Sequence, residues 1–169
     1  GASITALMTE VATGERGVVR FDMRSGRSTV LWKGRARLAN AFGDTTHQSI
    51  FALYQDIRTP PNVYRFPADF ATKDRVSHAD ERLDAVAVGS ADVFETVIPS
   101  YNGAIAKART AVLLPPGAKR GDRLPAVVLM YPGGDRSRQA EVFGAGEDLT
   151  IPTLLFTSAG MVQFKPYMM

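Results

Sequence analysis

The chain has 169 residues, of which 45% are hydrophobic and 22% are charged, the composition of a globular protein able to bury a core. Its formal net charge is only +3, and arginines alternate with acidic residues, which favours a solvated surface over a nucleic-acid-binding face. The absence of cysteine excludes disulfides and thiolate metal sites, and no apolar run approaches the ~20 residues that a membrane span requires.

The N-terminus carries no recognisable secretion signal. A signal peptide has a basic region that leads into an apolar stretch, and Gly1-Ala2-Ser3-Ile4-Thr5 shows neither. The initial glycine suggests a processed or engineered start. The compartment cannot be assigned from these residues, although the lack of a signal favours the cytoplasm.

Short segments of β type fill the first 80 residues. Gly26 lies in a turn where a positive φ is wanted, and Pro60-Pro61 interrupts a later run. Residues 34–48 are interpreted as the connection between two such parts. The predicted strands are 4–11, 18–22 and 28–32 in the first part, and 50–56 and 63–66 in the second.

These two parts nearly repeat each other. Ile4-Thr5-Ala6-Leu7 recurs as Ile50-Phe51-Ala52-Leu53, and Val18-Val19-Arg20-Phe21 recurs as Val63-Tyr64-Arg65-Phe66. A period of about 40 to 45 residues built from short β-type runs is typical of propeller blades. Since a propeller typically needs about four to eight blades, two blades predict that the chain belongs to something larger.

The character of the sequence changes after His78. Residues 80–84 are polar and helical or linker-like, and strands are predicted at 93–98, 104–114 and 124–131. The last of these is an uninterrupted apolar run, of the kind buried on both faces of a mixed or parallel sheet. We therefore predict blade repeats over residues 1–80, a linker over 81–92 and a second β-rich domain over 93–169.

Several motifs, in this order, resemble the prolyl oligopeptidase family of serine peptidases. They are Thr59-Pro60-Pro61-Asn62-Val63-Tyr64, Phe94-Glu95-Thr96-Val97, Ser100-Tyr101-Asn102-Gly103, Leu113-Leu114-Pro115-Pro116-Gly117 and the run from Leu124 to Pro132-Gly133-Gly134. The resemblance implies a mostly β fold in which two propeller-type blades precede the first strands of an α/β-hydrolase domain. It also implies a peptide substrate in a full-length protein.

The strand that ends in two glycines carries part of the oxyanion site in that family. The resemblance therefore makes Tyr131, Gly133 and Gly134 the candidate oxyanion-loop residues. Matching the glycines places Pro132 at the position before them, and proline has no N–H to aim at a developing negative charge.

The catalytic machinery of such an enzyme is absent from these residues. No Gly-x-Ser-x-Gly nucleophile elbow occurs, and the two histidines, His47 and His78, lie upstream of the second domain, where a surface or turn role is expected. We predict no catalytic residue, cofactor or metal site in this chain, and no peptide hydrolysis by the chain alone. The alternative is a non-catalytic module that binds peptides or proteins.

Other candidate sites have simpler interpretations. Gly133-Gly134-Asp135-Arg136-Ser137 lacks the Lys-Ser/Thr pair of a phosphate-binding loop, so it is interpreted as a turn with an exposed ion pair. Trp32 and Phe51 are predicted to pack in the blade core. Glu141, Glu147 and Asp148 are predicted to be surface groups.

The end of the sequence departs from the family pattern. Ser158-Ala159-Gly160 resembles the start of a further sheet strand, but residues 161–169 do not read as a strand that leads into a helix. They are predicted to expose apolar side chains or to pack against a partner. Open sheet edges in such a chain would invite self-association or strand exchange.

Overall fold

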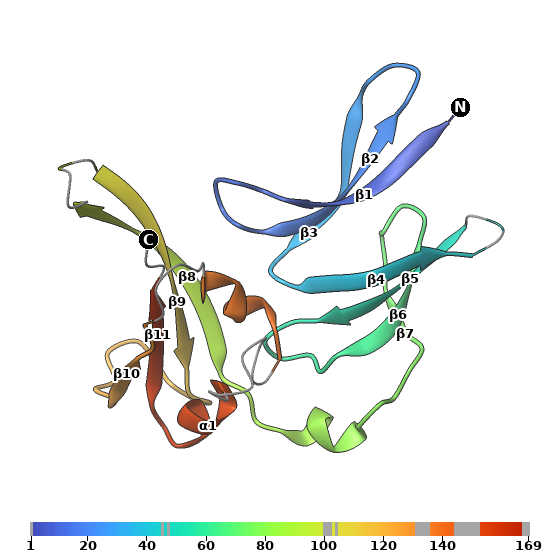
Figure 1. The fold of residues 1–169 in the computed structure, drawn as a ribbon. Coiled ribbons are helices and arrows are strands. Elements are labelled where there is room, and N and C mark those ends of the chain that lie inside the picture. The colour runs from blue at the N-terminus through green and yellow to red at the C-terminus, as the bar shows by residue number, and fades with distance from the viewer. Residues whose placement is uncertain are drawn as a thin grey trace. The chain divides into compact units, whose positions relative to one another are not determined.

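The computed structural model describes residues 2–44, 46, 48–99, 103, 105–130, 136–143 and 153–166 (Figure 1). The chain divides into two compact units. The first comprises Gly1–Asp56 with Pro60–Asp84, and the second comprises Ile57–Thr59 with Ala85–Met169. Each unit is described by itself below.

The first unit opens with a three-stranded antiparallel sheet. Its strands are β1 (Ser3–Thr9), β2 (Arg16–Asp22) and β3 (Ser28–Gly34), in that spatial order. The β2–β3 turn is fixed by Asp22, whose Oδ1 accepts hydrogen bonds from the backbone N–H groups of Arg24 at 2.9 Å and Ser25 at 2.8 Å. Gly26 supplies the positive φ of 69° predicted for this turn.

The second sheet has four antiparallel strands. They are β4 (Arg37–Gly43), β5 (Ser49–Gln55), β6 (Asn62–Pro67) and the short β7 (Asp74–Arg75), in sequential order across the sheet. Both sheets of this unit contribute to one apolar core rich in aromatic rings. Its buried members are Val18, Ala36, Leu38, Ala52, Tyr54, Tyr64, Phe66 and Phe70.

The interpretation of residues 34–48 as a connection is wrong, because β4 lies there. Leu38 is buried opposite Tyr54, so the segment contributes to the core. The register shifts between Ala39 and Phe42, and Asn40 adopts a positive φ of 51°. A bulge of this kind breaks the two-residue alternation by which strands are found in a sequence.

The internal repeat is confirmed in the pairing register. Ile4 faces Phe21 and Leu7 faces Val18 across β1 and β2. Across β5 and β6, the corresponding residues Ile50 and Leu53 face Phe66 and Val63. The repeated sequence therefore forms the same hairpin twice, and β1 is the counterpart of β5.

The second unit contains a mixed four-stranded sheet in the order β10-β11-β9-β8. Its elements are β8 (Ser90–Pro99), β9 (Ile105–Leu114), β10 (Ala126–Val128), the 3-10 helix η2 (Arg136–Glu141), α1 (Thr153–Ser158) and β11 (Val162–Pro166). β8, β9 and β11 are antiparallel neighbours, whereas β10 runs parallel to β11. Another 3-10 helix, η1 (Glu81–Ala85), precedes this sheet.

Two expectations about this sheet are wrong. The apolar run 124–131 was expected to be buried on both faces, but β10 covers only Ala126–Val128 and leaves Val128 53% exposed. The reason is its position at the sheet edge, with β11 as its neighbour in the described part of the chain. In turn, residues 161–169 are predicted to expose apolar side chains or to pack against a partner, yet they contain β11, which lies between β10 and β9 and buries Val162 within the sheet.

Candidate functional site

A site is expected at the end of the sheet where the carboxyl ends of β10 and β11 lie. In open sheets with parallel strands, ligands bind outside the carboxyl ends of those strands. Val128 pairs with Phe164, and the backbone N–H of Leu129 then donates to the Phe164 carbonyl at 2.8 Å. This hydrogen bond holds the chain against β11 as it leaves β10.

The three oxyanion-loop candidates follow directly, but they lie outside the described residues. This applies to Tyr131, Gly133 and Gly134 and to the intervening Pro132. The structure therefore describes the chain up to Met130, just after the carboxyl end of β10. The role of the three candidates stays a prediction. His47, Asp135, Glu147 and Asp148 also lie outside the described residues.

A group of buried polar side chains lies within this second unit, and sequence reasoning missed it. Lys165 of β11 is only 2% exposed, and its Nζ donates to Oε1 of Gln139 in η2, which is also buried. Burying a charged group costs free energy unless it is hydrogen-bonded, so this contact ties η2 to the central strand. The other buried polar residues of the unit are Thr110, Ser137, Glu141, Thr157 and Gln163.

Glu141 corrects an expectation of the sequence analysis. It was predicted to be a surface group, but it is 3% exposed at the end of η2. The prediction was wrong because it relied on the rule that carboxylate side chains are almost never buried unless they are paired. The one available signal was its position next to the apolar residues Ala140 and Val142, both of which are buried.

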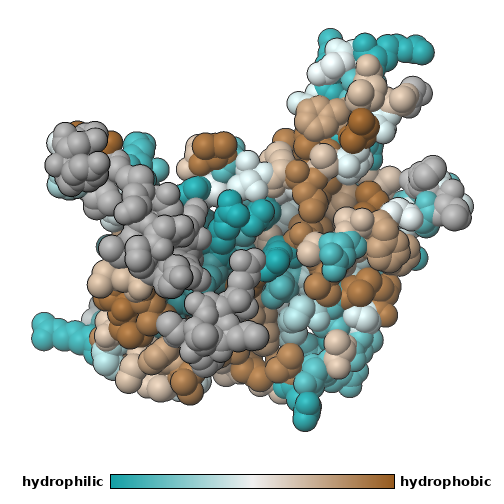
Figure 2. Space-filling view, in the orientation of Figure 1, coloured by the Kyte–Doolittle hydropathy of each residue, from teal (hydrophilic) through white to brown (hydrophobic). Residues whose placement is uncertain are grey.

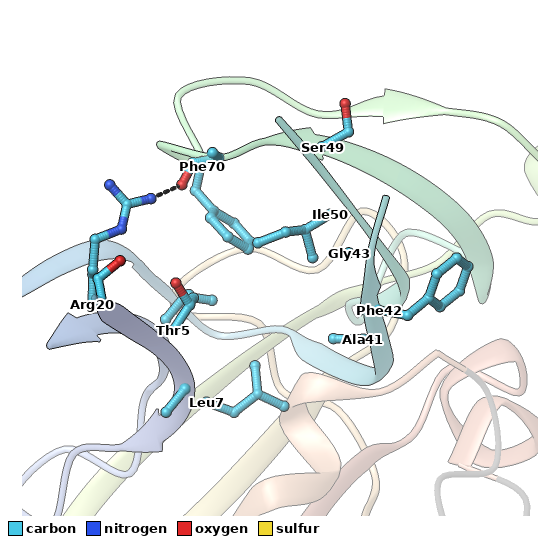
Figure 3. A pocket seen from close by; sticks show the side chains of 13 residues that line it. Thr5, Leu7, Arg20, Ala41, Phe42, Gly43, Ser49, Ile50 and Phe70 are labelled. Atoms are coloured by element: carbon cyan, nitrogen blue, oxygen red, sulfur yellow. Dashed lines mark hydrogen bonds between the residues drawn. The ribbon is translucent and has the colours of Figure 1, made fainter. Parts of the chain in front are cut away.

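An open groove lies in the first unit, between the sheet of β1 and the sheet of β4 (Figure 3). Its volume is about 670 Å³. Thr5 and Leu7 of β1 line one side, and Ile50 and Phe70 lie on the opposite side. Arg20 spans the two sheets by donating from Nη2 to the Ala68 carbonyl. Figure 2 shows exposed hydrophobic side chains over this part of the unit.

The two aromatic residues singled out in the sequence have different environments. Trp32 is partly buried and packs against the core, as predicted, with its ring 6.4 Å from that of Tyr54. Phe51 is also partly buried, but it stacks at 5.5 Å on Phe42, which is exposed. Phe51 therefore packs on Phe42 rather than in the buried core.

No metal site is formed by the part of the chain that the structure describes, where three or more His, Asp or Glu side chains do not gather anywhere. His78 is exposed and lies 3.4 Å from Glu81, which confirms a surface histidine. Among the described helices, none is long and apolar enough to cross a bilayer.

Comparison with known proteins gives matches among solved structures. No family model matches the chain, and no curated protein does. The ligand-free isopeptidase AtxE2 superposes with a TM-score of 0.73 and 15% identity over 98% of this chain. A puromycin-hydrolyzing peptidase of Mycobacterium tuberculosis gives 0.62 and 17% over 97%. A prolyl endopeptidase gives 0.59 and 15% over 98%.

The chain has the fold of the prolyl oligopeptidase family. The resemblance identified in the sequence is thus confirmed at the level of the fold, with two propeller-type blades followed by the first strands of an α/β-hydrolase sheet. The chain spans 24%, 24% and 22% of the three peptidase chains named above.

Proposed function

We propose that this chain is part of a prolyl oligopeptidase-like serine peptidase that hydrolyses peptide bonds. The proposal rests on the occurrence of blade hairpins and a mixed, partly parallel sheet in one chain. Two blade hairpins with the same pairing register precede a mixed sheet in which β10 and β11 are parallel neighbours. Peptidases with this fold match the chain over 97% to 98% of its length.

In this proposal residues 1–80 belong to the propeller and residues 93–169 to the hydrolase domain, joined by residues 81–92. The proposed contribution of the second part is the oxyanion loop at Tyr131, Gly133 and Gly134, which follows the carboxyl end of β10. The nucleophile elbow and the acid and histidine of a triad have no counterparts in the 169 residues. Catalysis therefore needs residues that this chain does not contain, and the chain alone is inactive.

The intact mass of the gene product in its native cell tests this proposal first. A mass several times 18.3 kDa is expected, together with labelling of that gene product by a serine-directed fluorophosphonate. The purified 169-residue chain should not be labelled by the same probe. Labelling of the short chain, or a large gene product that resists the probe, would contradict the proposal.

A non-catalytic binding module is the second candidate. The feature that favours it is the open groove of about 670 Å³ in the first unit, since ligand pockets typically measure about 300 to 1,000 Å³. A native mass near 18.3 kDa would favour this candidate, because the chain would then have no source of a catalytic serine.

A further inference from the structure

β11 carries two polar side chains on the face of its sheet that the 3-10 helix η2 covers. Residues directly opposite each other in an antiparallel pair lie on the same face of a sheet. Across β11 and β9, Gln163 faces Leu113, and Lys165 faces Ala111. Ala140 of η2 packs against Ala111 and Leu113, which places η2 on this face. The surface beneath η2 therefore combines apolar residues of β9 with polar residues of β11.

Lys165 is the more costly of the two polar residues to bury. It is 2% exposed, and its Nζ donates to Oε1 of Gln139, which is 9% exposed. A buried charge costs free energy unless it is hydrogen-bonded, and two apolar side chains of similar shape often support a fold equally well. Stability alone therefore does not account for the lysine. A hydrogen bond differs from an apolar contact in its fixed length and direction, so it defines where η2 lies along β11.

Phe164, the residue before Lys165, holds the chain on the other side of the candidate oxyanion loop. Its carbonyl accepts a hydrogen bond from the Leu129 backbone N–H at 2.8 Å, directly after β10 ends. Leu129 and Gln139 are thus held by consecutive residues of one central strand. Between them in the sequence lie the three candidates Tyr131, Gly133 and Gly134.

We propose that Lys165 is a positioning residue for the oxyanion loop and acts through its hydrogen bond to Gln139. The proposal rests on the proposed function, of which the oxyanion loop is a part. The donors of an oxyanion hole must lie about 2.7 to 3.1 Å from the developing negative charge, so a small displacement of the loop weakens them. Because Leu129 is held on Phe164, the position of Gln139 sets the span that the loop must cover.

The competing role of Lys165 is a contribution to stability only. In that case its loss would reduce the folded fraction and leave the rate constants of the folded enzyme unchanged. The contacts favour positioning, because Ala140 holds η2 on the sheet independently of Lys165. Loss of the hydrogen bond then lets η2 shift along the sheet without detaching from it.

The experiment compares variants of the full-length gene product in their reaction with a fluorophosphonate. The serine oxygen bonds to phosphorus, fluoride leaves, the serine proton passes to the histidine, and the phosphoryl oxygen gains negative charge that an oxyanion hole stabilises. Varying the probe concentration separates the maximal rate constant from the apparent Kd of the probe. Lys165→Met and Gln139→Leu should each lower the maximal rate constant at least about tenfold, less than the ~10²-fold or more for loss of one oxyanion donor, at unchanged apparent Kd.

Three further variants separate position from stability. Gln139→Glu keeps an acceptor oxygen for Nζ and should have a maximal rate constant close to that of the unsubstituted protein. The double variant Lys165→Met with Gln139→Leu removes both partners, so it should regain stability but not the rate. Val162→Ala removes buried methyl groups from β11 on the opposite face, so it should lower stability without lowering the rate constant.

The outcomes distinguish this proposal from the proposed function. Recovery of the rate constant together with stability in the double variant would overturn the positioning role. A decrease in Val162→Ala as large as that in Lys165→Met would do the same. Rapid labelling that is insensitive to Lys165→Met and Gln139→Leu would overturn this inference alone. An unsubstituted gene product that does not react with the probe would contradict the proposed function, and this inference with it.

Discussion

The carbonyl oxygen of Leu114 lies 1.6 Å from the position that a Cβ atom on Gly89 would occupy. Gly89 immediately precedes β8, and Leu114 ends β9, so the two backbones are in close contact at this end of the hairpin. The Gly89 carbonyl also accepts a hydrogen bond from Nε of Arg58 at 3.4 Å. The close approach therefore requires a residue without a side chain.

Gly89→Ala should lower the free energy of unfolding by about 3 kcal/mol, because the added methyl group can be accommodated only by moving backbone. Urea unfolding of the full chain measures the change. Gly43→Ala is the control, since its Cβ would meet no atom closer than 3.9 Å and should change stability by less than about 1 kcal/mol. Similar losses for both variants would contradict the steric argument.

Asn62 supports the second blade from inside, at 1% exposure. Its Oδ1 accepts hydrogen bonds from the Ser77 hydroxyl and the Ala79 backbone N–H, both at 3.0 Å. Asn62→Ala should lower the unfolding free energy by about 2 to 3 kcal/mol, because the Ser77 hydroxyl and the Ala79 N–H lose their acceptor inside the blade and the removed side chain leaves a gap there. Thermal unfolding tests this. Asp69→Ala removes an exposed acceptor of the Ala71 N–H and should cost clearly less.

Tyr54 gives the first unit an alkaline pH dependence. Burial raises the pKa of Tyr54, and its hydroxyl donates to Asp56 at 2.8 Å. The folded state then holds the phenol proton more tightly than the unfolded state, so stability is complete below the ordinary tyrosine pKa of about 10 and falls as the pH rises above it.

Tyr54→Phe should make the decline in unfolding free energy above pH ~10 less steep. A smaller decline should remain, because burial also raises the pKa of Tyr64. Urea unfolding at several alkaline pH values compares the two proteins. An unchanged slope in the variant would show that the Tyr54 phenol titrates normally.

Lys165 and Gln139 form a buried contact whose strength can be isolated. Lys165→Met keeps most of the side-chain volume but leaves the Gln139 carbonyl oxygen without its Nζ donor. We expect a loss of about 1 to 3 kcal/mol. In the double variant with Gln139→Leu, the losses should be less than additive by about 1 kcal/mol. Strictly additive losses in chemical unfolding would mean that the contact contributes nothing to stability.

The sequence predicts the repeated hairpins well because local signals agree there. In the first sheet Gly26 marks the turn, and the apolar residues of β1 and β2 have β-type spacing. β4 escapes detection because its bulge around Asn40 disturbs that spacing. A single irregular residue is enough to hide a strand whose existence depends on its neighbour β5.

The second unit shows a different cause of failure. β11 lies centrally in its sheet, but its buried Gln163 and Lys165 do not have the apolar character that is expected of a central strand. Their burial depends on residues distant in the sequence, such as Gln139, and no local pattern contains that information. Conversely, the apolar run around β10 suggests burial, although its edge position leaves Val128 exposed. The candidate site was found through family motifs, which indicate the loop after β10 without its side-chain geometry.

The parallel pairing of β10 with β11 restricts how this sheet could be enlarged. A strand that continued the parallel direction beyond β10 would need a crossover of a dozen or more residues, usually a helix. Such crossovers are right-handed in nearly all proteins, so the helix would have a predetermined side of the sheet. Parallel strands can therefore be added beside β10 only together with a crossover helix, and each such helix covers one face of the sheet. A hairpin added there without a helix would leave one face of its strands exposed to solvent.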